Sequence, residues 1–177
     1  MMDSCLSLRL SVLTYLILQG QVLHSATFPT AGGNATYNID AQINGSEPGV
    51  SRLILNNDGT TTMNIDDAIL QIVNFTTSSS ASGAADGGGP VSLDTATLNI
   101  NTLNNAQVIF QNNSYTSSTL DRISGGVINS NNSVLNIGRN TQFNQNNLNA
   151  NNNNISYGAA IHITGNSVLT IGDDVQF

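Results

Sequence analysis

Two pairs of neighbouring acids, Asp66-Asp67 and Asp173-Asp174, are the residues of this sequence best suited to chemistry. Glycoside hydrolysis uses two carboxyl groups placed roughly 5 to 9.5 Å apart around the bond that breaks. Each pair here follows the last isoleucine of a short apolar segment by one or two residues, where we expect the chain to turn. We therefore interpret both pairs as solvated turn residues, and not as the carboxylates of a catalytic centre.

A histidine and a glycine-rich segment are weaker candidates. His162 lies between Ile161 and Ile163, so on an alternating strand its ring faces outward, away from a second ligand or a nucleophile. The segment 83–89, Gly-Ala-Ala-Asp-Gly-Gly-Gly, is similar to one calcium-binding nonapeptide, but that kind of site is built from several copies. The sequence thus predicts no catalytic, cofactor-binding or metal-binding residue, no cofactor, and no enzymatic activity.

Composition narrows the fold class. The chain has 177 residues, eleven acids against four Lys plus Arg, and a formal net charge of −7. Nucleic-acid binding needs a basic surface, which this charge balance excludes. Only 8% of the residues are charged, while 39% are hydrophobic, a balance that argues against disorder. A single Glu and no Lys argue against a helical bundle, so we expect an all-β protein.

The strongest pattern is an internal repeat. Phenylalanine recurs at Phe75, Phe110, Phe143 and Phe177, at spacings of 35, 33 and 34 residues. Each Phe is preceded by an alternating apolar triplet, and these are Met63-Asn64-Ile65, Leu98-Asn99-Ile100, Leu135-Asn136-Ile137 and Leu169-Thr170-Ile171. A period in the mid-thirties indicates a repeat architecture, and the two-residue alternation indicates strands instead of helices.

This repeat predicts a parallel β-helix, in which each turn of the chain stacks on the one before it at a spacing of about 4.8 Å. Equivalent side chains then form columns. We expect Phe110 to stack inside on Phe143, Ile100 to pair with Ile137, and Asn side chains to form amide ladders between turns.

The chain divides into three parts. Residues 1–25 carry an apolar run, Leu10–Leu18, between a short leader and small residues, which predicts a signal peptide cleaved near Ser25–Thr27. Residues 26–49 do not fit the repeat, and we expect them to form an N-terminal cap over the first rung. Residues 50–177 are predicted to form about three to four rungs of the β-helix.

The intervals between rungs are expected to be polar surface loops that carry binding function. Their sequences contain few large apolar side chains, and they span residues 76–87, 111–124 and 144–157.

The repeat motifs resemble those of a known family. Gly125-Gly126-Val127-Ile128 followed by Phe143-Asn144-Gln145-Asn146, and then Gly158-Ala159-Ala160-Ile161 followed by Phe177, are similar to the repeat of chlamydial-type polymorphic outer membrane proteins. The resemblance covers residues 88–177. It implies a right-handed β-helix and an autotransporter passenger with a role in adhesion. Members of that family usually carry many more repeats and a C-terminal translocator barrel, so the resemblance implies that this chain is a fragment of a longer passenger.

The expected function is therefore that of a secreted or surface-displayed, adhesin-like passenger without catalysis. It would lie outside the cell or on its outer membrane, and would bind a receptor or glycan of a host or neighbouring cell. Two alternatives stay open: a fragment of a secreted β-helical polysaccharide lyase or hydrolase, and an unrelated structural repeat protein of the cell surface. We also expect self-association through the C-terminal rung, residues 158–177, where Asp173 and Asp174 are the only acids or Lys or Arg residues that could protect an open edge.

Overall fold

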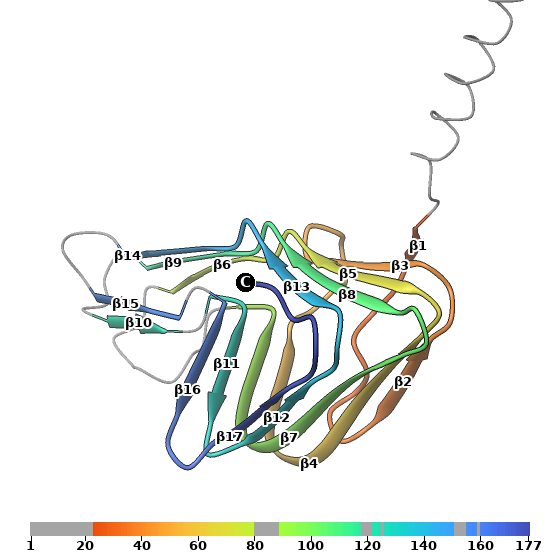
Figure 1. The fold of residues 1–177 in the computed structure, drawn as a ribbon. Helices are drawn as coiled ribbons and strands as arrows, with labels where there is room; N and C mark the ends of the chain where they lie inside the picture. Colours follow the sequence, from red (N-terminus) through yellow and green to blue (C-terminus); the bar gives the residue numbers. More distant parts are fainter. Residues whose placement is uncertain (1–22, 80–88, 118–121, 125, 151–154, 159) are drawn as a thin grey trace, which may run out of the picture.

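The computed structural model describes residues 23–79, 89–117, 122–124, 126–150, 155–158 and 160–177. Within these ranges the chain is all-β and contains no helix (Figure 1). It follows that no membrane-spanning helix is found in the described part of the chain. The predicted signal peptide lies almost wholly outside the described residues, and so does most of the glycine-rich segment 83–89.

A broad sheet bends around two sides of the molecule (Figure 1), and all its strand pairs are parallel. Its two long members bend at a corner. The strands of this sheet are β2 (Asn34–Tyr37), β4 (Leu53–Asp66), β7 (Val91–Leu103), β11 (Ile128–Asn131), β12 (Val134–Ile137), β16 (Ile161–Thr164) and β17 (Val168–Ile171).

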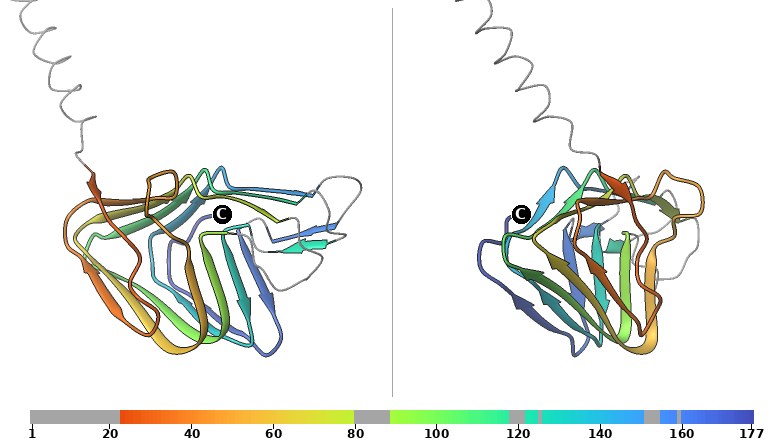
Figure 2. Two further views of the ribbon diagram at one scale, coloured as in Figure 1. Left: turned by 180° about the vertical axis from the view of Figure 1, so that it is seen from behind. Right: turned by 90° about the vertical axis from the view of Figure 1, so that its right-hand side faces the viewer.

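A second parallel sheet faces it across the core (Figures 1 and 2). Its strands, in spatial order, are β1 (His24–Ser25), β3 (Ala41–Asn44), β5 (Ile69–Val73), β8 (Gln107–Gln111) and β13 (Thr141–Asn144). Two smaller parallel sheets lie beside these. One contains β6 (Thr76–Ser79), β9 (Ser114–Ser117) and β14 (Asn147–Ala150), and the other contains β10 (Arg122–Ser124) and β15 (Ile155–Tyr157).

Strands pair with their equivalents in the next repeat, and we call each such repeat a rung. Leu98 pairs with Leu135, which in turn pairs with Leu169. Ile100 pairs with Ile137, which confirms the predicted isoleucine ladder. Val91, Ile128 and Ile161 also follow one another in register, so the two quoted motifs that end at Ile128 and Ile161 occupy equivalent places in adjacent rungs.

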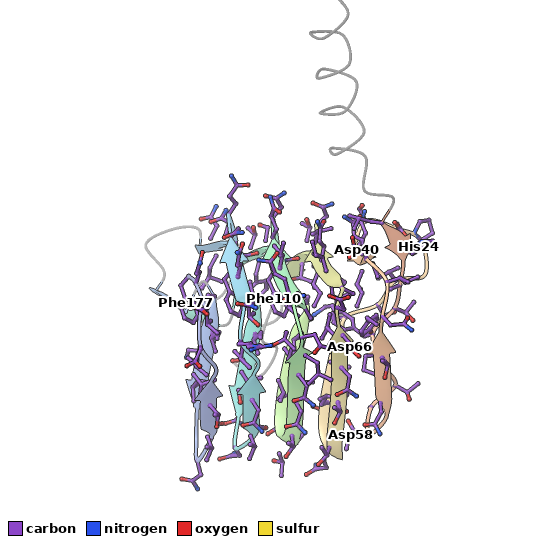
Figure 3. All side chains as sticks on the ribbon, turned by 45° about the vertical axis from the view of Figure 1, so that its right-hand side comes forward. His24, Asp40, Asp58, Asp66, Phe110 and Phe177 are labelled. Atoms are coloured by element: carbon purple, nitrogen blue, oxygen red, sulfur yellow. The ribbon has the colours of Figure 1, made fainter. Side chains whose placement is uncertain are left out.

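The core is a set of side-chain columns that run through the rungs. Phe110 and Phe143 are both buried, and their rings stack at 4.9 Å between centroids with 3° between planes. This confirms the predicted phenylalanine stack. Phe177 extends it, with its ring 5.1 Å from that of Phe143; Figure 3 labels Phe110 and Phe177 at the two ends of this column.

Phe75 is not in that column, and the prediction that it repeats Phe110 is wrong. Ile72 pairs with Phe110 instead, and the backbone N–H of Phe75 donates to the side-chain oxygen of Asn113. The Phe75 ring packs against Phe28, 5.8 Å away between centroids. It also fills the space that a Cβ on Gly45 would need.

The prediction that the triplet Met63-Asn64-Ile65 is equivalent to Leu98-Asn99-Ile100 is also wrong by two residues. Met63 pairs with Ile100, and Thr61 takes the position opposite Leu98. At the irregularity between Asn56 and Gly59 the separation of partners falls from 38 to 37 residues, whereas the predicted equivalence of Met63 with Leu98 requires 35. Thr61, Met63 and Ile65 are all buried, so the shift by two leaves the same side of the strand facing the core.

The segment 26–49 was expected to lie outside the repeat as a cap, but its strands pair with the following rung. It supplies β2, which pairs with β4, and β3, which pairs with β5. Residues 26–33 lead from β1 to β2, and Phe28 in this stretch packs on the core. The segment therefore forms part of a rung of its own.

The prediction of polar loops is corrected in part, because each interval contains a strand. Residues 80–88, 118–121 and 151–154, in the middle of the predicted loops, lie outside the described residues. β6, β9 and β14 form a three-stranded sheet, while β10 and β15 pair beneath it. We call these five strands the arm. In Figures 1 and 2 the arm projects away from the side of the molecule that carries β2 and β4.

Candidate functional site

The asparagine of the Phe-x-x-Asn motif binds the neighbouring rung. Asn113 is buried, and its amide donates to the carbonyl oxygen of Ile72 at 3.0 Å. Asn146 repeats this bond to the carbonyl of Phe110, also at 3.0 Å. The Asn113 side-chain oxygen accepts from Phe75 N–H, and the Asn146 oxygen accepts from Asn113 N–H. These bonds satisfy backbone groups where the chain turns.

The residue before Asn113, before Asn146 and before Phe75, which takes the equivalent place one rung earlier, has a left-handed backbone. Asn74, Asn112 and Gln145 have φ values of 58°, 55° and 53°. Asn and Gly tolerate this region best, which explains why Asn is frequent at this corner. The motif residues are therefore structural, and they do not form an exposed ligand site.

Serines have the same role at a second corner. Ser133 accepts from the backbone N–H of Ala96 at 3.1 Å, and Ser167 accepts from that of Ser133 at 3.0 Å. Ser133 also donates to the carbonyl oxygen of Asn131. A buried hydroxyl that both donates and accepts leaves no free polar group in the core.

Amide ladders on the outer face confirm a further prediction. Asn136 donates to Asn99 at 2.8 Å, and Asn101 donates to Asn64 at 3.0 Å. Each bond joins two adjacent rungs at 37 residues of sequence separation. The ladders consume part of the hydrogen-bonding capacity of these side chains, and they carry no charge.

The acid pair Asp66-Asp67 is used in a similar ladder. Asp66 accepts from the amide of Asn104, and Asp67 accepts from that of Asn105 at 3.4 Å. Asp173 and Asp174 belong to the last rung, so they lie three rungs from the first pair, roughly 14 Å at the usual spacing of strands. The structure therefore does not bring the two pairs together at the separation needed for glycoside hydrolysis.

His162 pairs in register with Asn129, and its Nδ1 lies 3.0 Å from the Asn129 side-chain oxygen. Partial burial lowers the pKa of His162, because desolvation disfavours the imidazolium. In the described ranges no group of three or more His, Cys, Asp or Glu side chains could hold a metal ion. His162 thus joins a rung-to-rung ladder.

Two arginines also bind neighbouring backbone. Arg52 donates from Nε to the carbonyl of Gly89 at 2.6 Å, and Arg139 donates from Nη2 to the carbonyl of Asn104. Arg122 lies on β10, in the arm, where only its backbone pairing with Ile155 is described. Arg139 lies in the corner that also carries the acid pairs, because Asn104 donates to Asp66 and the Asn140 N–H donates to the carbonyl oxygen of Asp173.

The arm has a packed side and a polar side. Tyr115 is buried, and Leu148, its register partner, is half-buried. The residues on the alternate positions of β9 and β14 point to the other side, and Asn147 and Asn149 are exposed. These alternate positions hold hydroxyl and amide groups and no charge: Thr76, Ser114, Thr116, Asn147 and Asn149.

The sequence analysis missed this arm surface because the intervals are polar. The signal that could have revealed it is the alternation in Ser114-Tyr115-Thr116-Ser117, which contains two residue types that favour strands. No protein-family model, no curated protein and no solved structure matches the chain. The functional assignment therefore depends on the arrangement of these described residues.

Proposed function

We propose that the chain is a right-handed parallel β-helix and serves as a secreted or surface-displayed passenger that binds other cells without catalysis. All described strand pairs are parallel. The partners of β1 and β3 lie 17 residues apart (His24 and Ala41), and those of the other pairs lie 28 (Asn34 and Thr62) to 38 (Leu53 and Val91) residues apart. Chain order follows spatial order in the second sheet, as expected if the chain advances one rung per turn. Parallel crossover connections strongly favour the right-handed form.

The single observation that carries the binding function is the arm. Three successive rungs leave the body at the same place, and their strands stack in register as β6, β9 and β14. Repeat scaffolds use such per-repeat insertions on one face for recognition. The uncharged hydroxyl and amide groups on the polar side of the arm suit a glycan, or a receptor that carries one, because sugars present hydroxyls that both donate and accept.

Binding is favoured over catalysis by how the candidate acids are held. Asp66 and Asp67 accept hydrogen bonds from amides of the next rung, and the second acid pair lies on a distant rung. A polysaccharide lyase or hydrolase would need these carboxylates around one bond. The binding experiment below distinguishes an adhesin from an unrelated structural repeat protein of the cell surface.

The placement outside the cell is supported by the apolar run in the first 25 residues. The resemblance to polymorphic outer membrane proteins is supported by the register of the small-residue steps, since Val91, Ile128 and Ile161 align. Display as an autotransporter passenger at the outer membrane follows from that resemblance.

The test is binding of the purified chain to a glycan array and to cultured cells. We expect saturable binding that the Asn149→Arg variant lowers at least tenfold, because the larger charged side chain covers the polar side of the arm. The matched control is Asn101→Arg, an equally drastic change at an exposed asparagine on the body, which we expect to leave binding unchanged.

Absence of binding to any cell or glycan would contradict the adhesin proposal and favour a structural role. Cleavage of a polysaccharide, with new reducing or unsaturated ends detected, would favour the alternative enzymatic role. Binding that Asn101→Arg and Asn149→Arg lower equally would remove the arm as the site.

A further inference from the structure

The polar side of the arm differs from the outer face of the body in what its side chains bind. On the body, amides of adjacent rungs bond to each other, as in the pairs Asn136–Asn99 and Asn101–Asn64. On the polar side of the arm, no side chain forms a hydrogen bond with another residue that the structure describes. These side chains are Thr76, Ser114, Thr116, Asn147 and Asn149. Their hydroxyl and amide groups are therefore free to bind a ligand.

The free groups form two rows that run across the strands of the arm (Figure 1). Thr76, Ser114 and Asn147 are register partners on β6, β9 and β14. Thr116 and Asn149 form a second row, two residues further along their strands. Neighbours within a row lie about 4.8 Å apart, and the two rows lie roughly 7 Å apart. The face thus presents hydrogen-bonding groups that repeat regularly along the stack of rungs.

The strands of this face carry neither charge nor an exposed ring. Their sequences are Thr-Thr-Ser-Ser, Ser-Tyr-Thr-Ser and Asn-Leu-Asn-Ala, and the one aromatic residue among them, Tyr115, is buried on the other side. The net charge of −7 for the whole chain disfavours an anionic ligand. A sugar on this face is held by hydrogen bonds alone, and each of them replaces a bond to water and contributes little. Useful affinity therefore requires several sugars bound at once.

We infer that the ligand of this face is a linear, uncharged glycan in an extended conformation. It runs along the stack of rungs across β6, β9 and β14, with one sugar on each strand. The inference rests on the proposed binding function and names the class of ligand that the same face takes.

The repeat of the ligand matches the repeat of the face. In an extended linear glycan the hydroxyl groups recur once per sugar, and the length of one pyranose unit is close to the distance between two neighbouring strands. Each sugar therefore presents its hydroxyls to the next strand in turn. Sugar hydroxyls donate and accept, as do the hydroxyl and amide groups of the two rows. A branched glycan does not place successive sugars in one line, and an acidic glycan carries charge that this face does not compensate.

Length dependence is the measurable consequence. Once the first sugar is bound, the next sugar of the same chain binds at a high effective concentration, so weak contacts add up along the row. The affinity should rise until all three described strands are occupied, and it should rise little after that.

The first test is calorimetric titration of the purified chain with β-1,4-linked oligomers of glucose, mannose, xylose and N-acetylglucosamine. Each series contains one, two, three and six sugars. In at least one series we expect the trisaccharide to bind at least about tenfold more tightly than the monosaccharide, with little further gain at six sugars. Affinity that does not rise with length in any of the four series would overturn the inference.

The second test blocks the two ends of the row. Thr76 and Asn147 are exposed and lie on the outer strands β6 and β14. Thr76→Arg or Asn147→Arg should each lower the affinity for the trisaccharide to that of the disaccharide, and should change the affinity for the monosaccharide little. Asn101→Arg on the body is the matched control and should leave the whole series unchanged. Equal losses for the monosaccharide and the trisaccharide would contradict an arrangement of one sugar on each strand.

The outcomes separate this inference from the function on which it rests. Binding to a branched glycan, an acidic glycan or a receptor without sugars, if lost in Asn149→Arg, would overturn the linear ligand and leave the arm as an adhesive surface. Absence of binding to any glycan or cell would remove both.

Discussion

The role of a polar side chain in this molecule depends on whether it hydrogen-bonds to a neighbouring rung. Asn113 has an amide group that could recognise a ligand, yet it is buried and donates to Ile72 of the preceding rung. Asn146 does the same one rung later. The abundance of asparagine therefore has a structural cause, because Asn tolerates the left-handed backbone and satisfies the backbone groups of a corner.

The first prediction at this scale concerns Asn113. The Asn113→Ala variant leaves the carbonyl of Ile72 and the N–H of Phe75 without their partners, and it should lower the free energy of unfolding by about 1–3 kcal/mol. Asn101→Ala removes an exposed ladder amide and should change it by less than about 0.5 kcal/mol. Urea unfolding of both variants measures the difference, and equal losses would contradict the structural role.

The second prediction concerns the phenylalanine column. Phe143 is buried between Phe110 and Phe177, so Phe143→Ala should cost about 3–5 kcal/mol of unfolding free energy. Phe177→Ala in the same column should cost much less, because the Phe177 ring is 69% exposed. Thermal and denaturant unfolding provide the comparison. A loss below about 1 kcal/mol for Phe143→Ala would show that this ring is not a core residue.

The sequence predicted the stacking of Phe110 on Phe143, since both have Asn three residues later. It did not predict the place of Phe75, which has Ser78 there. The missing Asn three residues after Phe75 was the sign in the sequence that Phe75 is not equivalent to Phe110. In the structure, Phe75 itself takes the register position of Asn113. A period counted on one residue type cannot distinguish two positions that lie three residues apart.

At the scale of elements, the period-2 pattern of β4 fixes which side faces the core but not the register. Thr61, Met63 and Ile65 are all buried, and a shift by two residues keeps each of them inside. The irregularity near Gly59, where the φ value is 73°, changes the separation of partners by one residue, from 38 to 37. The arm strands were missed for another reason, because their polar composition resembles that of loops.

The segment before β3 contains a titratable group that allows a test at this scale. Burial raises the pKa of Tyr37 to about 12, above the value of about 10 expected in the unfolded chain. The folded state thus holds the proton more tightly, and this contribution is fully present below pH 10 and is lost as pH rises through 12. Stability should fall by up to about 1.4 kcal/mol for each pH unit in that window.

The measurement is the free energy of unfolding from pH 9 to 12 for the wild type and for Tyr37→Phe. The variant should start less stable, because it loses the bond to Thr27, and it should show a weaker decline with pH. Identical slopes for the two proteins would contradict the buried position of the Tyr37 hydroxyl.

At the scale of the whole molecule, the all-β class and the parallel order of repeats followed from composition and period. The division of roles between the rungs and the arm did not follow from composition or period. The rungs use their polar side chains on each other, while the polar side of the arm remains available for contacts. That division depends on strand pairing between residues more than 30 positions apart, which no local pattern encodes.

The central claim is that successive repeats stack as parallel rungs in one register, and engineered disulfides test it most directly. Thr62, Asn99 and Asn136 occupy one outward column on three adjacent rungs, with neighbours about 4.8 Å apart. A disulfide needs Cα atoms within roughly 4.4–6.8 Å. In a Cys5→Ser background, the pair Asn99→Cys and Asn136→Cys should therefore oxidise quantitatively. The pair Thr62→Cys and Asn136→Cys, two rungs apart, should remain reduced within the monomer. Failure of the first pair to close, or equal closure of both pairs, would contradict the account.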